Sequence, residues 1–252
     1  MLEICVDSIT SAIAAAEGGA SRIELCSALS EGGLTPTVGT LKALKSVPIN
    51  IPIFCMLRPR RGNDFMYTNA EMDALLYDMA LFKSHGCDGF VFGALDKNRD
   101  VCEWQCRQVV QMAGNLPVTF HRAFDLTAPC KMHETVDQIK SLGFARILTS
   151  GFKHSCLQGI YNIRELCNQH KDIIIMPGAG ISASNLEEIL RETKCNEFHA
   201  SARKKVDQPI CTTANISMGG GEADLEPMFI TDECLVRELI AIAERNKTVS
   251  NK

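Results

Sequence analysis

Residues 2–26 read LEICVDSITSAIAAAEGGASRIELC and decide the fold class. Two short apolar runs, Leu2–Asp7 and Arg22–Cys26, flank an alanine-rich segment that ends at Gly18-Gly19. Alternation of strand-like runs with helical segments is typical of parallel βαβ units. A glycine at a helix end suits the left-handed turn that leads into the next strand. The opening residues therefore predict one strand–helix–strand unit.

The same unit recurs along the chain. Eight segments read as strands: Leu2–Asp7, Arg22–Cys26, Pro52–Arg58, Gly89–Leu95, Pro117–Arg122, Arg146–Ser150, Ile173–Gly178 and Glu197–Arg203. A single (β/α)8 TIM-type barrel usually has about 250 residues, and this chain has 252. An open doubly wound α/β sheet is the alternative. We expect one domain over residues 1–252, with a long loop, 204–230, after the eighth strand.

Composition argues against several classes of protein. The formal net charge of −4 and the shortness of the basic clusters at 58–61 and 203–205 give no reason to expect nucleic acid as a partner. No run of about 18 apolar residues occurs, so no membrane span is expected, and the chain does not open like a signal peptide. The 12 cysteines include no Cys-x-x-Cys pair and are expected to be reduced, as in an intracellular protein.

Strand parity gathers polar side chains inside the barrel. One face of a barrel strand meets the helices and must be apolar, so alternate residues point inward. In the first, second, fifth and eighth strands, the inward residues are polar or carry sulfur: Glu3, Cys5, Asp7, Arg22, Glu24, Cys26, Thr119, His121, Glu197, His199, Ser201 and Arg203. The end of the third strand adds Arg58.

These inward residues divide into two groups. Glu3, Arg22 and Glu197 lie low in the barrel, where we expect paired ions that fill its bottom, because unpaired buried charges are costly. The others lie near the carboxyl ends of the strands, where barrel active sites form. We expect a binding or catalytic pocket there, built from Asp7, Glu24, Arg58, His121, His199 and Arg203. The candidates for proton transfer are His121, Asp7, Glu24 and His199.

A glycine-rich loop and three arginines favour an anionic ligand. The segment after the seventh strand contains Gly178-Ala179-Gly180, and a glycine-rich loop at this place in a barrel often offers backbone N–H groups to a phosphate or carboxylate. A tight turn that needs glycine is the other explanation. With Arg58, Arg60 and Arg203, this loop favours a TIM-barrel enzyme acting on a small phosphate- or carboxylate-bearing metabolite.

Two cysteines share the inward parity. Cys5 and Cys26 lie on consecutive strands, and adjacent strands are about 4.8 Å apart. Two such thiols could bind a soft ion such as Cu(I), which prefers thiolate ligands. They could also be small buried residues that only fill the core.

Eight segments of the chain resemble the copper homeostasis protein CutC family, in order, over about residues 2–203. They are LEICVDS from Leu2, GGASRIELCSALSEGGLTP from Gly18, RPRRGNDF from Arg58, DGFVFGAL from Asp88, TFHRAFD from Thr119, RILTSG from Arg146, IMPGAGI from Ile175 and EFHASAR from Glu197. The resemblance implies a TIM-type barrel with a role in copper homeostasis, cytoplasmic (or nuclear), and commonly a homo-oligomer. It also implies Cu(I) binding at the positions of Cys5 and Cys26. The resemblance therefore favours metal binding by these two cysteines over mere core filling.

The chain departs from the family pattern at three places. Arg61 and an extra residue near Asn63 alter the loop after the third strand, and Phe152 and Ala179 stand where glycines are usual. The last two could narrow an anion site. Three hypotheses remain: a Cu(I)-binding homeostasis protein, an enzyme on a small anion, and a scaffold acting through oligomer surfaces that include the long loop.

Overall fold

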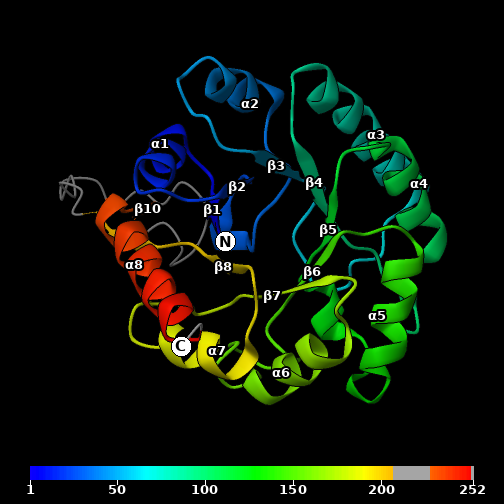
Figure 1. Cartoon of the computed structure of the whole chain (residues 1–252). Coiled ribbons are helices and arrows are strands. Elements are labelled where there is room, and N and C mark those ends of the chain that lie inside the picture. The colour runs from blue at the N-terminus through cyan, green and yellow to red at the C-terminus, as the bar shows by residue number, and fades with distance from the viewer. Residues whose placement is uncertain (207–227, 251–252) are drawn as a thin grey trace, which may run out of the picture.

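The computed structural model describes residues 1–206 and 228–250. Eight parallel strands form a nearly closed barrel, and helices surround it (Figure 1). The strands are β1 (Leu2–Val6), β2 (Arg22–Leu25), β3 (Ile53–Met56), β4 (Gly89–Phe92), β5 (Val118–Phe120), β6 (Arg146–Thr149), β7 (Ile174–Pro177) and β8 (Phe198–Ala200). The expected (β/α)8 barrel is confirmed, with each strand shorter than the sequence pattern suggested.

A helix follows each strand in the chain. The helices are α1 (Ile9–Glu17), α2 (Val38–Lys45), α3 (Asn69–Ser84), α4 (Glu103–Ala113), α5 (Met132–Ser141), α6 (Ile160–Gln169), α7 (Leu186–Thr193) and α8 (Glu233–Ser250). Short 3-10 turns cover Leu29–Glu31, Arg122–Leu126 and Pro129–Lys131. Among the described residues, no helix combines the length and apolar composition that a membrane span needs.

The strand order is β7-β6-β5-β4-β3-β2-β1-β8, so nearly every strand pairs with its neighbour in sequence. Glu3 of β1 is in register with Arg22 of β2 on one side and with His199 of β8 on the other. Cys5 is in register with Glu24. This register brings polar residues of three strands together inside the barrel.

The parity expected from the sequence holds in these strands. Ile4 and Val6 of β1 and Ile23 and Leu25 of β2 are buried in the main hydrophobic core, together with apolar residues of the surrounding helices. Burial of this helix-facing layer is the main favourable term in the stability of the fold. The alternate residues are left to face the barrel interior.

Two short strands follow the barrel. β9 (Arg203–Lys205) and β10 (Phe229–Thr231) pair antiparallel and lead into α8. They are the two ends of the expected loop 204–230, and residues 207–227 of that loop lie outside the described residues.

Candidate functional site

A cavity of about 950 Å³ opens among the loops at the carboxyl ends of the strands. Seven residues that the sequence predicted for a site line it: Cys5, Glu24, Arg58, His121, Gly180, His199 and Arg203. Its position at this end of the barrel agrees with the general placement of active sites in TIM barrels. The shared cavity expected from strand parity is therefore present.

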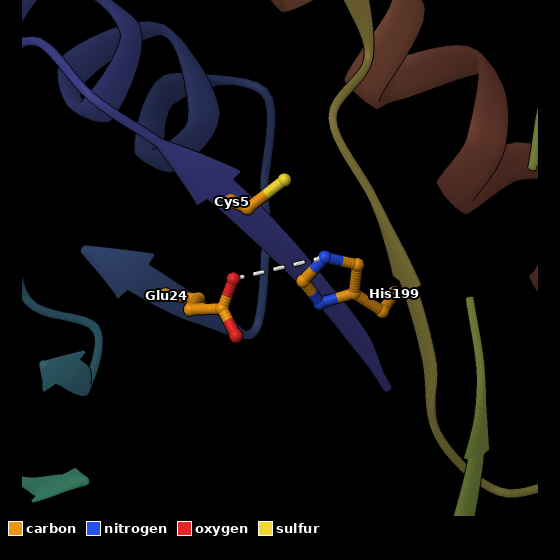
Figure 2. Close-up of side chains that lie close together, drawn as sticks. All are labelled: Cys5, Glu24 and His199. Atoms are coloured by element: carbon orange, nitrogen blue, oxygen red, sulfur yellow. Dashed lines mark ion pairs between the residues drawn. The ribbon is translucent and has the colours of Figure 1, made fainter. Parts of the chain in front are cut away.

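Three potential metal ligands meet in this cavity. Cys5 of β1, Glu24 of β2 and His199 of β8 each offer one ligand atom, and the three atoms lie within 4.8 Å of one another. Figure 2 shows Glu24 and His199 pointing toward one another, with Cys5 beside them. Nε2 of His199 lies 3.9 Å from Oε2 of Glu24. A thiol, a carboxylate and an imidazole at this spacing could hold a transition-metal ion.

An ionic network supports His199 from below. His199 Nδ1 donates a hydrogen bond to Oε1 of Glu3 at 2.7 Å. The other oxygen of Glu3 accepts from Nε of Arg22 at 2.5 Å, and Arg22 Nη2 donates to Glu197 at 2.6 Å. The expectation that Glu3, Arg22 and Glu197 form paired ions in the barrel is confirmed. A carboxylate that fixes the second nitrogen of an imidazole is a common support for a metal-binding histidine.

Arg146 belongs to the same network, although the sequence analysis did not include it. Its Nε lies 3.3 Å from Oε2 of Glu197, and its guanidinium lies over the Phe54 ring. The sequence does contain a pattern that predicts its position. Arg22 and Arg146 each open a strand and directly precede an isoleucine of the helix-facing core. The same parity rule, applied to the sixth strand, would have placed Arg146 inside.

Burial and neighbouring charges shift the pKa values of Glu3 and Glu24 in opposite directions. Burial alone would raise the pKa of Glu3, but the hydrogen bond from His199 and the charge of Arg22 lower it to about 2. Burial raises the pKa of Glu24 to about 7, and the nearby His199 opposes this shift only in part. Oε1 of Glu24 is buried and has no hydrogen-bond partner among the described residues.

His199 lies between these two carboxylates. Burial would lower its pKa, but Cys5, Glu24 and Glu3 together raise it well above the usual value. His199 therefore keeps its second proton at a higher pH than an ordinary histidine.

Cys26 lies beside the three-residue cluster without belonging to it. Its Sγ donates to Oε2 of Glu24 at 3.6 Å, and its side chain packs with Phe54, Met56 and Val91 inside the barrel. Burial, followed by the charges of Glu24 and Cys5, raises the pKa of the Cys26 thiol well above its usual value. Cys26 is thus inward-facing, as expected, and in contact with one member of the cluster.

The opposite wall of the cavity carries Arg58 and His121. Arg58 is 5% exposed and lies over the Phe65 ring. His121 is 4% exposed, and its ring also packs against Phe65, with 4.9 Å between the ring centroids. Each has a buried nitrogen, Nε of Arg58 and Nε2 of His121, without a hydrogen-bond partner in the described part of the chain.

Three predicted site residues lie outside the cavity lining. Asp7 follows the end of β1, and its Oδ2 accepts a hydrogen bond from the Leu29 amide at 3.0 Å. Arg60 is held by Asp64 and Glu71, with N–O distances of 2.7 Å. Gly178 stands close to the His199 side chain, where a Cβ would lie 3.4 Å from that of His199. Asp7 and Arg60 thus lie apart from the other predicted site residues, whereas Gly178 lies beside His199 without lining the cavity.

Asp125 has a structural role that the sequence analysis did not assign. Its carboxylate accepts hydrogen bonds from Ser150 and from the Phe152 amide, and it pairs with Arg122 at 2.9 Å. These contacts fix the loop after β6, where Phe152 adopts a positive φ of 63°. The motif Thr119–Asp125 therefore supplies three residues that line the cavity, His121, Arg122 and Asp125, and Asp125 also fixes the loop after β6.

Comparison with known proteins identifies relatives over nearly the whole chain. The chain is 52% identical over 248 residues to the copper homeostasis protein cutC homolog of Drosophila melanogaster, covering 96% of this chain and 94% of the relative. It is 43% identical to the homologue of the same name from Homo sapiens, covering 97% of this chain and 89% of the relative.

A solved structure shares the fold. The crystal structure of the putative copper homeostasis protein CutC from Streptococcus agalactiae superposes with a TM-score of 0.76 at 30% sequence identity, covering 80% of this chain and 98% of that chain. A thiamine phosphate pyrophosphorylase from Pyrococcus furiosus, at 16% identity and a TM-score of 0.59, shows the fold alone. The family model described as "CutC family" matches residues 1–204. The chain belongs to the CutC family.

Proposed function

We propose that this protein serves copper homeostasis by binding Cu(I) inside the barrel, with Cys5 and Cys26 as thiolate ligands. Its relatives are named copper homeostasis proteins. Cu(I) is a soft ion that prefers thiolate ligands, and both cysteines face the barrel interior. A cytosolic location and a homo-oligomeric state are part of the same proposal.

One observation carries the proposal: ligand atoms from three strands converge on the side of the cavity where both cysteines lie. Cys5, Glu24 and His199 meet within 4.8 Å, and Cys26 contacts the Glu24 carboxylate at 3.6 Å. Glu24 therefore adjoins both thiols. The Glu3–His199 hydrogen bond holds the imidazole in place beneath them.

An anaerobic competition titration against a chromophoric Cu(I) chelator tests the proposal. The parent protein should carry Cys130→Ser and Cys234→Ser, because these two exposed thiols could bind copper adventitiously. Loss of a residue that only orients a ligand typically weakens metal binding by about 10–100-fold. Loss of a ligand should cost at least as much, so we expect Cys5→Ser and Cys26→Ser each to weaken Cu(I) binding by that factor or more.

Cys156→Ser is the matched control. Cys156 is also buried, but it packs in the helix-facing core and not inside the barrel. Cu(I) affinity should be unchanged in this variant. Unchanged affinity in Cys26→Ser would contradict its assignment as a ligand, and unchanged affinity in both Cys5→Ser and Cys26→Ser would contradict the proposed site.

A further inference from the structure

The cavity is larger than a metal site requires. Pockets for small organic ligands typically measure about 300–1,000 Å³, and this one has a volume of about 950 Å³. Cys5, Glu24 and His199 occupy the side formed by β1, β2 and β8. The remaining wall comes from the loops after β2, β3, β5, β6 and β7 and includes Arg58 and His121.

Arg58 is a buried cation without a counter-charge. Its Nη1 donates to the carbonyl oxygens of Glu31 and Gly33, and its Nη2 donates to that of Gly62. These three carbonyls fix the guanidinium but do not neutralise it. No carboxylate within the described ranges forms an ion pair with it, and its Nε–H remains unused. A buried charge without an opposite partner is strongly unfavourable, so an anion in the cavity would stabilise it.

His121 presents a fixed hydrogen-bond donor beside this cation. Its Nδ1 accepts the amide hydrogen of Ala123 at 3.2 Å, so the proton of a neutral ring is on Nε2. Burial and the charges of Arg58 and Arg122 lower the pKa of His121 to about 3, which keeps the ring neutral. Gly93 packs against the ring so closely that a Cβ would lie 2.6 Å from Nδ1. The ring is held in place, and Nε2–H has no partner in the described part of the molecule.

The charges around this wall also favour an anion. Arg122, Lys153 and Arg203 line the cavity as well. Of the acidic lining residues, Asp125 is paired with Arg122, Glu31 lies 3.4 Å from Arg61, and Glu24 lies 3.9 Å from His199. Arg58, Lys153 and Arg203 remain without an ion-pair partner among the described residues, so positive charge prevails at the mouth.

We propose that the wall formed by Arg58 and His121 binds the carboxylate or phosphate group of a small organic anion, at a subsite separate from the Cu(I) ligands. The Nε–H of Arg58 and the Nε2–H of His121 are the two donors, and because both atoms are buried, their side chains must shift slightly for an anion to reach them. Neither donor is a proposed copper ligand, although Gly33, which accepts a hydrogen bond from Arg58, also lies against Cys26.

Isothermal titration calorimetry of the metal-free, full-length chain tests this proposal with three matched probes. Glycerol 3-phosphate carries a phosphate, glycerate carries a carboxylate, and glycerol carries neither. We expect at least one of the two anions to bind with a Kd below about 1 mM, equivalent to about −4 kcal/mol, while glycerol does not bind. Which anion binds more tightly distinguishes a phosphate from a carboxylate site. Absence of binding by both anions would overturn the proposal.

His121→Asn is the decisive variant. The asparagine Oδ1 can still accept the Ala123 amide hydrogen, but the variant lacks the Nε2–H donor. We expect it to remain folded by circular dichroism and to bind the anion at least about tenfold more weakly, equal to about 1.4 kcal/mol. Arg58→Gln should weaken binding further; if its lost carbonyl contacts prevent folding, His121→Asn still decides the question.

Two controls complete the experiment. Arg107→Gln removes an arginine of α4 whose side chain is 52% exposed and does not line the cavity, and it should leave the Kd unchanged. The double variant Cys5→Ser/Cys26→Ser should also bind the anion normally, so failure of the Cu(I) proposal and failure of this one are distinguishable. Equal binding by His121→Asn, Arg58→Gln and the parent would overturn the proposal.

Discussion

The bottom of the barrel and the cavity at the carboxyl ends of its strands both contain buried charged residues, but these residues are paired differently. Glu3, Arg22, Arg146 and Glu197 form an ionic network at the bottom of the barrel, which we call the lower network. Arg22 contacts Glu3 and Glu197, and Arg146 lies 3.3 Å from Glu197, so each charge has an opposite neighbour. In the cavity, Arg58 has no ion-pair partner among the described residues, and Oε1 of Glu24 and Nε2 of His121 have no hydrogen-bond partner there. Nε of Arg146 in the lower network also lacks a hydrogen bond, but it lies beside the Glu197 carboxylate. Paired buried ions serve the fold, whereas unpaired ones are retained where a ligand can satisfy them.

Backbone strain is also concentrated at the cavity end of the barrel. Within residues 1–206 and 228–250, seven non-glycine residues have a positive φ, and six of them lie in loops that leave the carboxyl ends of strands: Ala28, Phe65, Arg99, Phe152, Ala179 and Ala202. Only Lys194, at the end of α7, lies elsewhere. Left-handed backbone costs a non-glycine residue about 1–2 kcal/mol. Strain of this kind concentrates at functional sites, which agrees with a cavity shaped for binding.

The largest effect is expected from breaking the lower network. Arg22→Met leaves Glu3 and Glu197 buried without their main cation, and removal of one partner from a buried ion pair costs about 3–5 kcal/mol. Urea denaturation of the metal-free protein measures the loss. Arg60→Met is the control, because the Arg60 side chain is 40% exposed and such pairs contribute at most about 1 kcal/mol. Equal losses in the two variants would contradict the distinction.

Acid should weaken the lower network next. The pKa of Glu3 is lowered from 4.5 to about 2 in the folded state. The stability that it contributes is therefore complete above the unfolded value and is lost as the pH falls toward the folded one. We expect a loss of about 2 kcal/mol between about pH 5 and pH 3. Glu3→Gln should lack this part of the pH dependence; an unaltered slope in that variant would exclude Glu3 as its source.

The contribution of Glu24 to stability should change with pH in the opposite direction to that of Glu3. Glu24 keeps its proton in the folded state up to about pH 7, whereas an unfolded glutamate loses it near its ordinary pKa, so rising pH favours unfolding. Glu24→Gln removes this penalty, which amounts to about 3 kcal/mol at pH 8 and about 1 kcal/mol at pH 5. The buried amide that replaces the carboxyl costs about 2 kcal/mol, so we expect a net stabilisation of the metal-free protein of about 1 kcal/mol at pH 8 and none at pH 5. Thermal melts at the two pH values measure the gain. Destabilisation at pH 8 would mean that the carboxylate is well paired.

The smallest effect is expected at Ala179. This residue lines the cavity with a φ of 75°, a conformation that glycine adopts without strain. Ala179→Gly should therefore raise the free energy of unfolding by about 0.5 kcal/mol, since relief of strain exceeds the added entropy of the unfolded chain. A loss of stability of the same size in urea denaturation would show that the alanine methyl group packs favourably.

The fold and much of the site were predictable because both depend on short-range periodicity. Alternation of strand and helix predicted eight βα units, and a period of two along each strand placed Cys5, Glu24 and His199 on the inner face. Asp7 shows where this rule ends. β1 stops at Val6, so parity no longer determines the direction of the next side chain, and Asp7 caps the Leu29 amide instead.

Contacts within loops were not predictable from periodicity. Arg58 and Arg60 are two residues apart in the chain, yet Arg58 points into the cavity, whereas Arg60 pairs with Asp64 and Glu71. The choice depends on which partners the folded loop brings near. The association of His199 with both Glu3 and Glu24 likewise depends on the register between β8, β1 and β2, which no local pattern specifies.

The central claim is that inward-facing cysteines at the carboxyl ends of β1 and β2 bind Cu(I). X-ray absorption spectroscopy of the Cu(I)-loaded chain tests it most directly, in the parent that lacks Cys130 and Cys234. We predict two sulfur atoms at about 2.3 Å, as for zinc–thiolate bonds, with one lost in Cys5→Ser and one lost in Cys26→Ser. A sulfur shell that is unchanged in the double variant would contradict the claim.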